Sequence, residues 1–123
     1  MKVAVSAGSA GREALVDQRF GRCAYFVFVD TETGETISHA NGAVASGHGA
    51  GVQAAQFVVG EGADTVISGR VGPNAFQVLS AAGVKVYQSA GQTVGEALED
   101  LEAGKFEEVS GPTGPAHAGS RRR

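Results

Sequence analysis

The chain of 123 residues has no tryptophan, a single cysteine and no long apolar segment. One cysteine excludes an internal disulfide and any zinc site built from several cysteines. No apolar run approaches the ~20 residues that cross a membrane, and the amino terminus becomes polar too soon for a signal peptide. We therefore expect a cytoplasmic protein without a membrane partner.

Charge is also sparse, because charged residues make up 19% of the chain and the net charge is only -3. This balance gives no support for nucleic-acid binding, and we expect no specific nucleic-acid partner. Hydrophobic residues make up 42%, which is ordinary for a globular domain and too apolar for disorder. A chain of this length can form one domain with a real core.

Glycine is abundant instead, with 19 residues, and several arginines gather in two loops. Arg12, Arg19 and Arg22 lie in the first loop, and Arg70 lies in the second. Glycines in loops are typical of tight turns and of places where a ligand approaches the backbone closely. The two features together direct attention to the loops as the functional part of the chain.

Hydrophobic periodicity predicts five strands, over residues 2–6, 24–30, 36–39, 64–68 and 84–87. Three helices are predicted as well: one over 50–59, one from near Pro73 to just before Gly83, and one from Thr93 to Gly104. Thr93 and Glu96 have the spacing of a capping box at the start of the third helix. The loop over residues 7–22 is expected to contain a helical turn at 13–16.

The order of these elements predicts an α/β fold with three layers. The later strands alternate with helices, which favours parallel pairing through right-handed crossovers. The first three strands form a meander, so the second runs antiparallel. We predict a mixed five-stranded sheet of order 3-2-1-4-5 with helices on both faces. Residues 1–109 form the single domain, and residues 110–123, which lack an apolar pattern, are expected to be a flexible tail.

This topology brings three loops, over residues 7–22, 41–49 and 69–73, to the edge where the parallel strands end. The first and fourth strands leave in opposite directions there, so a crevice opens between them. The residues expected on this rim are Arg12, Arg19, Arg22, Cys23, His48 and Arg70.

Two helices begin at the same rim, one after GHGAG at 47–51 and the other after GRVGPN at 69–74. Helix starts offer unpaired N–H groups and the positive end of the helix dipole. We therefore predict a site for a fairly large anion. Its binding residues are Arg19, Gly21, Arg22, Gly49, Gly51, Arg70, Gly72 and Asn74.

The segments DQRFGRCAYFVFVD, HGAGVQAAQ and DTVISGRVGPNAFQVLSAAGVKVY together resemble the dinitrogenase iron–molybdenum cofactor biosynthesis family. That family contains the NifX-type carriers and the domain attached to the NifB radical enzyme. The resemblance covers residues 1 to about 107, essentially the whole chain before the tail. It implies a ribonuclease H-like domain that binds, carries or delivers an anionic iron–sulfur or iron–molybdenum-type cluster without catalysis. It also implies cluster-donor and cluster-acceptor proteins as partners.

Such a cluster is stabilised by N–H donors and arginines, and it can be held by thiolate or imidazole. Cys23 and His48 are the candidate metal ligands. One cysteine cannot supply the four ligands of a permanent cluster, so the cluster would be transient cargo. A homodimer could complete the coordination from two sites, so monomer and homodimer both stay open.

Simpler roles exist for these residues. A lone cysteine beside a strand is most often a small buried hydrophobe, although Arg19 and Arg22 would lower the pKa of an exposed Cys23 thiol. The arginines can instead pair with carboxylates such as Asp17. The glycines can serve as turns and helix starts alone.

Other functions stay open too. A small-anion or nucleotide-binding module would use the same loops, although GRVGPN lacks the ending of a P-loop. A regulatory or scaffold domain would bind a partner protein with this rim. A metal-dependent hydrolase is less favoured, because the first strand carries no acid and Asp30 is expected at the opposite end of the sheet from Asp17.

Overall fold

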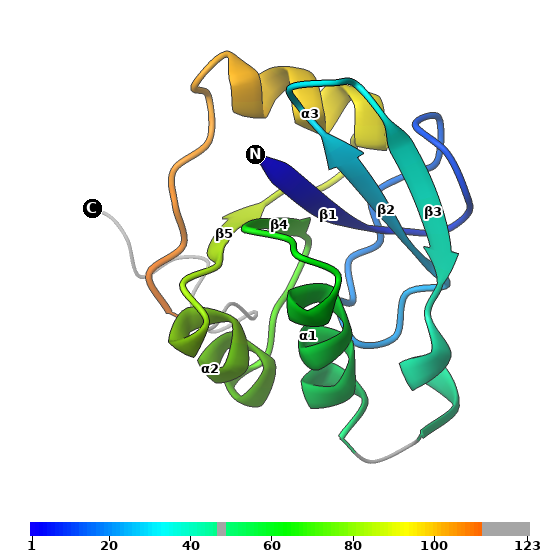
Figure 1. The fold of residues 1–123 in the computed structure, drawn as a ribbon, viewed down its shortest axis with the longest axis vertical. Coiled ribbons are helices and arrows are strands. Elements are labelled where there is room, and N and C mark those ends of the chain that lie inside the picture. The colour runs from blue at the N-terminus through cyan, green and yellow to red at the C-terminus, as the bar shows by residue number, and fades with distance from the viewer. Residues whose placement is uncertain (47–48, 112–123) are drawn as a thin grey trace.

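The computed structural model describes residues 1–46 and 49–111, so His48 and most of the expected tail lie outside the described part of the chain. The sheet and its helices are shown in Figure 1. The strands are β1 (Lys2–Ala7), β2 (Tyr25–Asp30), β3 (Thr36–Ala40), β4 (Thr65–Ser68) and β5 (Lys85–Gln88). The helices are the short 3-10 helix η1 (Gly42–Ser46), α1 (Ala50–Gly60), α2 (Pro73–Ala81) and α3 (Val94–Glu102).

The five strands form one mixed sheet in the order β3-β2-β1-β4-β5. Strand β2 is antiparallel to both β1 and β3, whereas β1, β4 and β5 pair in parallel. The predicted strand order and the predicted direction of β2 are therefore confirmed. The carboxyl ends of β1, β4 and β5 meet at one edge of the sheet, and the loops that follow them begin there.

Two hydrophobic layers enclose the sheet, since α1 and α2 cover one face and α3 covers the other (Figure 1). Successive residues of a strand point to opposite faces. In β1, Ala4 therefore packs with the layer of α1 and α2, while Val3 and Val5 pack with α3. The prediction of helices on both faces of the sheet is confirmed.

The loop between β1 and β2 contains no helical turn, so that expectation is wrong. Val16 forms a β-bridge with Ala7, and Leu15 forms one with Thr93 at the start of α3. Arg12 also departs from the expected rim. Its Nε donates to Thr36 Oγ1 at 3.1 Å, and Thr36 begins β3 at the opposite edge of the sheet.

The segment after α3 runs along the outer edge of β5. Glu108 forms a bridge with Tyr87, and the Val109 N–H donates to the Val86 carbonyl at 2.7 Å. The ring of Phe106 lies 6.2 Å from that of Tyr87. Residues beyond α3 thus belong to the folded domain. No helix in the described ranges is long and apolar enough to span a bilayer.

Candidate functional site

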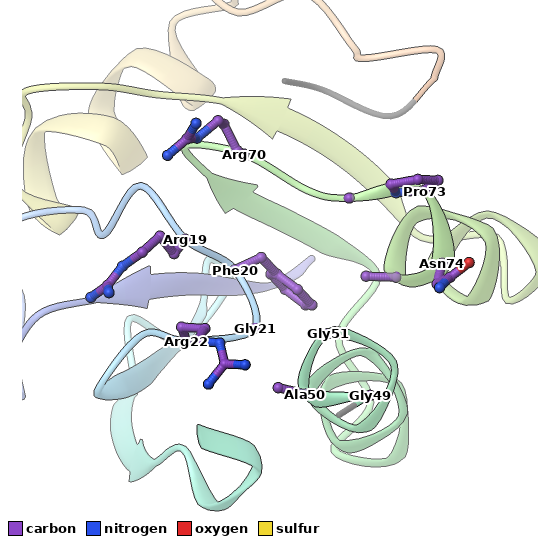
Figure 2. A pocket seen from close by; sticks show the side chains of 12 residues that line it. Arg19, Phe20, Gly21, Arg22, Gly49, Ala50, Gly51, Arg70, Pro73 and Asn74 are labelled. Carbon is purple, nitrogen blue, oxygen red and sulfur yellow. The ribbon is translucent and has the colours of Figure 1, made fainter. Parts of the chain in front are cut away.

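A pocket of about 420 Å³ lies at the sheet edge where β1 and β4 end, between the β1–β2 loop and the starts of α1 and α2 (Figure 2). The lining residues are Arg19, Phe20, Gly21, Arg22, Gly49, Ala50, Gly51, Arg70, Gly72, Pro73, Asn74 and Ala75. All eight residues predicted to bind an anion are among them. The structure thus brings the predicted set together in one cavity, while their role as ligands stays a prediction.

Both helices that border the pocket begin without a side-chain cap. Gly49, at the N-cap of α1, has φ 73°, and Gly72 precedes α2 in an extended conformation. Neither makes a side-chain cap hydrogen bond. Pro73 has no N–H, so the donors of α2 begin at Asn74. The first turns of both helices therefore bring N–H groups and partial positive charge to the pocket wall.

The glycines of the wall serve two different purposes. A Cβ on Gly21 would lie 2.7 Å from the backbone of Gly51, so only glycine lets the loop pack against the start of α1. A Cβ on Gly72 would meet nothing within 4 Å, and its φ of -70° suits any residue. Neither steric crowding nor backbone conformation requires glycine at position 72. Its effect is to leave that part of the pocket open.

Every charged residue lining the pocket is an arginine. Backbone pairing joins two of their loops, because Arg19 and Arg70 form a parallel bridge and the Phe20 N–H donates to the Arg70 carbonyl at 3.2 Å. In Figure 2 the Arg22 guanidinium is directed toward the start of α1, whereas that of Arg19 extends away from it. The pocket therefore combines positive charge with backbone donors.

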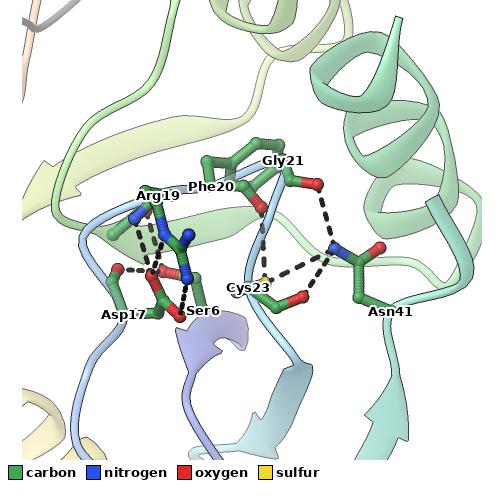
Figure 3. A network of polar contacts seen from close by, with 8 residues as sticks. Ser6, Asp17, Arg19, Phe20, Gly21, Cys23 and Asn41 are labelled. Atoms are coloured by element: carbon green, nitrogen blue, oxygen red, sulfur yellow. Dashed lines mark hydrogen bonds and ion pairs between the residues drawn. The ribbon is translucent and has the colours of Figure 1, made fainter. Parts of the chain in front are cut away.

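Cys23 lies beneath this wall, with no exposed surface. Its thiol donates to the Phe20 carbonyl at 3.3 Å, and the Asn41 amide lies 3.7 Å from the sulfur (Figure 3). Burial raises the pKa of the Cys23 thiol to about 12, so it stays protonated at neutral pH. The placement favours the simpler role of a small buried hydrophobe over that of a metal ligand.

Asn41 holds the backbone behind the pocket wall, and it is not among the residues predicted from the sequence to form the site. Its Nδ2 donates to the carbonyls of Gly21 at 3.1 Å and Cys23 at 2.9 Å (Figure 3). Its Oδ1 accepts the Ala43 N–H at 3.1 Å. The Asn41 side chain thereby connects η1 to the part of the β1–β2 loop that carries Arg19 and Arg22, the arginine loop. An asparagine after a strand is usually a turn former, so no local pattern indicates these distant partners.

His48, the second candidate metal ligand, lies outside the described residues, and its role stays a prediction. Within residues 1–46 and 49–111, no group of three or more histidine, cysteine, aspartate or glutamate side chains is placed to hold a metal ion. What the described pocket offers a ligand is positive charge, N–H donors and an apolar floor that includes Phe20.

Comparison with known proteins extends these observations. Residues 1–104 match the model of a family described as "Dinitrogenase iron-molybdenum cofactor". A protein of Methanocaldococcus jannaschii, itself uncharacterized, is 31% identical over 91 residues, which are 72% of this chain and 77% of that protein.

Two solved structures share both the fold and much of the sequence. The apo form of the orange protein from Desulfovibrio gigas has a TM-score of 0.89 and 43% identity, over 92% of this chain and 96% of that one. A NifB-like protein from Thermotoga, of the DUF35 family, has a TM-score of 0.81 and 38% identity, over 93% and 97% of the two chains.

Proposed function

This chain belongs to the dinitrogenase iron–molybdenum cofactor family, as its sequence predicted, and we propose that it binds and carries an anionic iron–sulfur or iron–molybdenum-type cluster. The observation that carries this proposal is that three arginines and two uncapped helix starts line the same pocket. The name of the family refers to this cofactor. The two similar solved structures, a NifB-like protein and the apo form of the orange protein, also support a ligand-binding role.

The pocket has the size and chemistry for such cargo. Its volume of about 420 Å³ falls within the range of ordinary ligand pockets. Clusters with sulfide and thiolate ligands are usually anionic, and hydrogen bonds to sulfur stabilise them. Helix N-termini bind anions through N–H groups and the helix dipole, and arginines add charge.

The mode of holding follows from the placement of Cys23. Because this thiol is buried and protonated, we propose that charge and N–H donors hold the cluster without a bond from Cys23. Contacts of this kind are reversible, which suits transient cargo passed from a cluster-donor protein to a cluster-acceptor protein. Imidazole ligation by His48 remains part of the proposal, and a His48→Ala variant tests it.

An anaerobic titration tests the proposed function directly. The probe is a synthetic [4Fe–4S] cluster with four thiolate ligands, followed by absorbance and, after reduction, by electron paramagnetic resonance. We expect saturable binding to the wild-type protein. Arg22→Gln and Arg70→Gln should each weaken binding about tenfold, since a hydrogen bond to a charged group contributes ~1.5 kcal/mol.

Arg12→Gln provides the matched control. It removes the same charge, but Arg12 bonds to Thr36 and does not line the pocket. Binding by this variant should equal that of the wild type. An absence of wild-type binding, or equal losses in all three arginine variants, would contradict a specific site in this pocket.

A small-anion or nucleotide-binding regulatory role is the second candidate, because uncapped helix starts also accept phosphate groups. Thermal-shift measurements with ATP, NAD and FMN separate the two functions. Stabilisation by a nucleotide, without binding of the synthetic cluster, would favour this second role.

A further inference from the structure

Asp17 is a mostly buried acid beside the pocket, and hydrogen bonds hold its backbone in place. Its N–H donates to the Ser6 carbonyl at 2.8 Å, and its own carbonyl accepts the Ser6 hydroxyl at 2.8 Å and the Gly69 N–H at 3.3 Å (Figure 3). Only 13% of its side chain is exposed. The chain on its other side is closely packed as well, because a Cβ on Gly69 would lie 2.4 Å from the Cα of Gln18. The backbone of Asp17 is therefore anchored beside the pocket.

The partner of this carboxylate is a pocket arginine whose side chain is largely exposed. Asp17 Oδ1 accepts the Arg19 N–H at 2.9 Å and the Arg19 Nε–H at 3.3 Å, while Oδ2 lies 3.5 Å from Nη2. The Arg19 side chain is 61% exposed. Its guanidinium folds back over Asp17 in Figure 3 and is directed away from the helix starts in Figure 2.

We propose that Asp17 competes with the bound anion for Arg19 and thereby sets how firmly the pocket retains its cargo. The inference rests on the proposed function, since it concerns the same pocket. In the free protein Arg19 pairs with Asp17. When an anion binds, the guanidinium turns to it, and when the anion leaves, the carboxylate takes the guanidinium back. Asp17 is thus a positioning residue that assists release.

The size of the effect follows from the exposure of Arg19, which leaves its end of the ion pair in contact with solvent. Ion pairs at exposed positions are weak and are exchanged readily. Losing this competition should therefore change affinity by about two- to fivefold rather than by orders of magnitude. The change should appear mainly as slower dissociation, because most differences in affinity between related complexes lie in the off-rate.

A double-mutant cycle tests the assignment with the synthetic [4Fe–4S] cluster. Asp17→Asn keeps an oxygen that can accept the Arg19 N–H and removes only the charge. We expect it to bind the cluster about two- to fivefold more tightly and to release it more slowly. Arg19→Ala should bind more weakly. Adding Asp17→Asn to Arg19→Ala should then have no further effect, since the competition needs both residues.

Glu13→Gln is the control for charge alone. Glu13 is an exposed acid on the same loop and does not line the pocket, so its removal should leave affinity unchanged. If Asp17→Asn strengthens binding equally with and without Arg19, the effect is one of general charge and the proposal is wrong. If Asp17→Asn weakens binding in a protein that is still folded by circular dichroism, the proposal is wrong as well.

A second probe separates this inference from the proposed function. Sulfate can be titrated into the same four proteins and followed through the amide resonances of Gly51 and Asn74. Coupling with sulfate, without any binding of the cluster, would support the role of Asp17 and overturn the cluster proposal. Cluster binding without coupling between Asp17 and Arg19 would support the cluster proposal and overturn the role of Asp17. If neither anion shifts these resonances or binds, both proposals fail.

Discussion

At the scale of single residues, the glycines of the pocket wall are not equivalent. Gly21 packs against the backbone of Gly51, so a methyl group there forces the loop and α1 apart. We expect Gly21→Ala to lower the free energy of unfolding by about 1–3 kcal/mol, as overpacking does. Gly72→Ala adds its methyl to open space and should lower the free energy of unfolding by less than about 1 kcal/mol. Urea unfolding of both variants measures the difference.

Cluster binding by the folded Gly72→Ala protein completes this comparison. The added methyl lies in the pocket wall next to the first donors of α2, so the variant should bind the cluster less tightly than the wild type. Unchanged affinity would show that the ligand does not approach position 72.

Cys23 gives a prediction about reactivity. Because its thiol is buried and its pKa is raised to about 12, iodoacetamide should leave it intact in the native protein and modify it after unfolding. Mass spectrometry of the treated protein measures this. Cys23→Ala should still bind the synthetic cluster. Rapid labelling of Cys23 in the folded protein would contradict the burial of its thiol.

The same thiol predicts how stability depends on pH. The unfolded chain loses the thiol proton near the ordinary pKa of 9.0, while the folded protein keeps it until about 12. Between these values the unfolded state binds fewer protons, so the contribution of Cys23 to stability is full below pH 9 and falls as pH rises. Urea midpoints at pH 8, 9 and 10 should fall more for the wild type than for Cys23→Ala.

Residue types and helix geometry were enough to predict eight of the twelve residues that line the pocket, while their role as ligands stays a prediction. Arginines in rim loops and glycines at helix starts could be placed because loops after parallel strands share one edge. The side chains of Arg12 and Cys23 could not be placed, because the path of a long loop decides whether they face solvent. That path depends on contacts such as the one between Asn41 and Gly21, which are distant in sequence.

At the scale of elements, the start of α3 is fixed by local side chains. Thr93 Oγ1 accepts the Glu96 N–H at 3.1 Å, and Glu96 Oε1 accepts the Thr93 N–H at 2.9 Å, which confirms the predicted capping box. Thr93→Ala should lower the free energy of unfolding by ~1 kcal/mol. Thr93→Ser keeps the hydroxyl and should lose much less. Urea denaturation of the two variants checks the difference, and equal losses would argue against the cap.

Elements defined by local signals agree with their predicted positions to within one or two residues. The helical turn expected in the β1–β2 loop does not form, because Leu15 and Val16 pair with Thr93 and Ala7 instead. Local sequence could not reveal the pairing of Leu15, since its partner Thr93 lies near the other end of the domain in sequence. Long-range bridges therefore decided the one segment for which the helical expectation was wrong.

At the scale of the whole molecule, the segment after α3 bears on the predicted boundary of the domain. Phe106 packs on the layer of α3, and Val109 packs on that of α1 and α2. A chain that ends at Gly104 should therefore lose roughly 2 kcal/mol of stability through the lost burial. A chain that ends at Gly111 should keep the melting temperature of the full protein, in line with the predicted domain of residues 1–109. Calorimetry of the two truncations tests this boundary.

The overall architecture was predictable because few topologies satisfy the order of the elements. Helices between the later strands require parallel crossovers, and the short turn after Asp30 requires a hairpin. Together these rules leave β1 in the centre of the sheet, with β2 on one side and β4 on the other. These rules concern the length and type of the connections between strands, and they do not depend on the conformation of any particular loop.

The central place of β1 also has a consequence during synthesis. Strand β1 leaves the ribosome before β2 and β4 and can pair early with β2. Its other side waits for β4, as the 62-residue separation of Ser6 and Ser68 shows. Late closure of this kind slows folding and leaves a strand edge uncovered in the nascent chain. Because the start of α2 follows β4 and completes the pocket wall, a partly synthesised chain that lacks β4 also lacks the complete pocket.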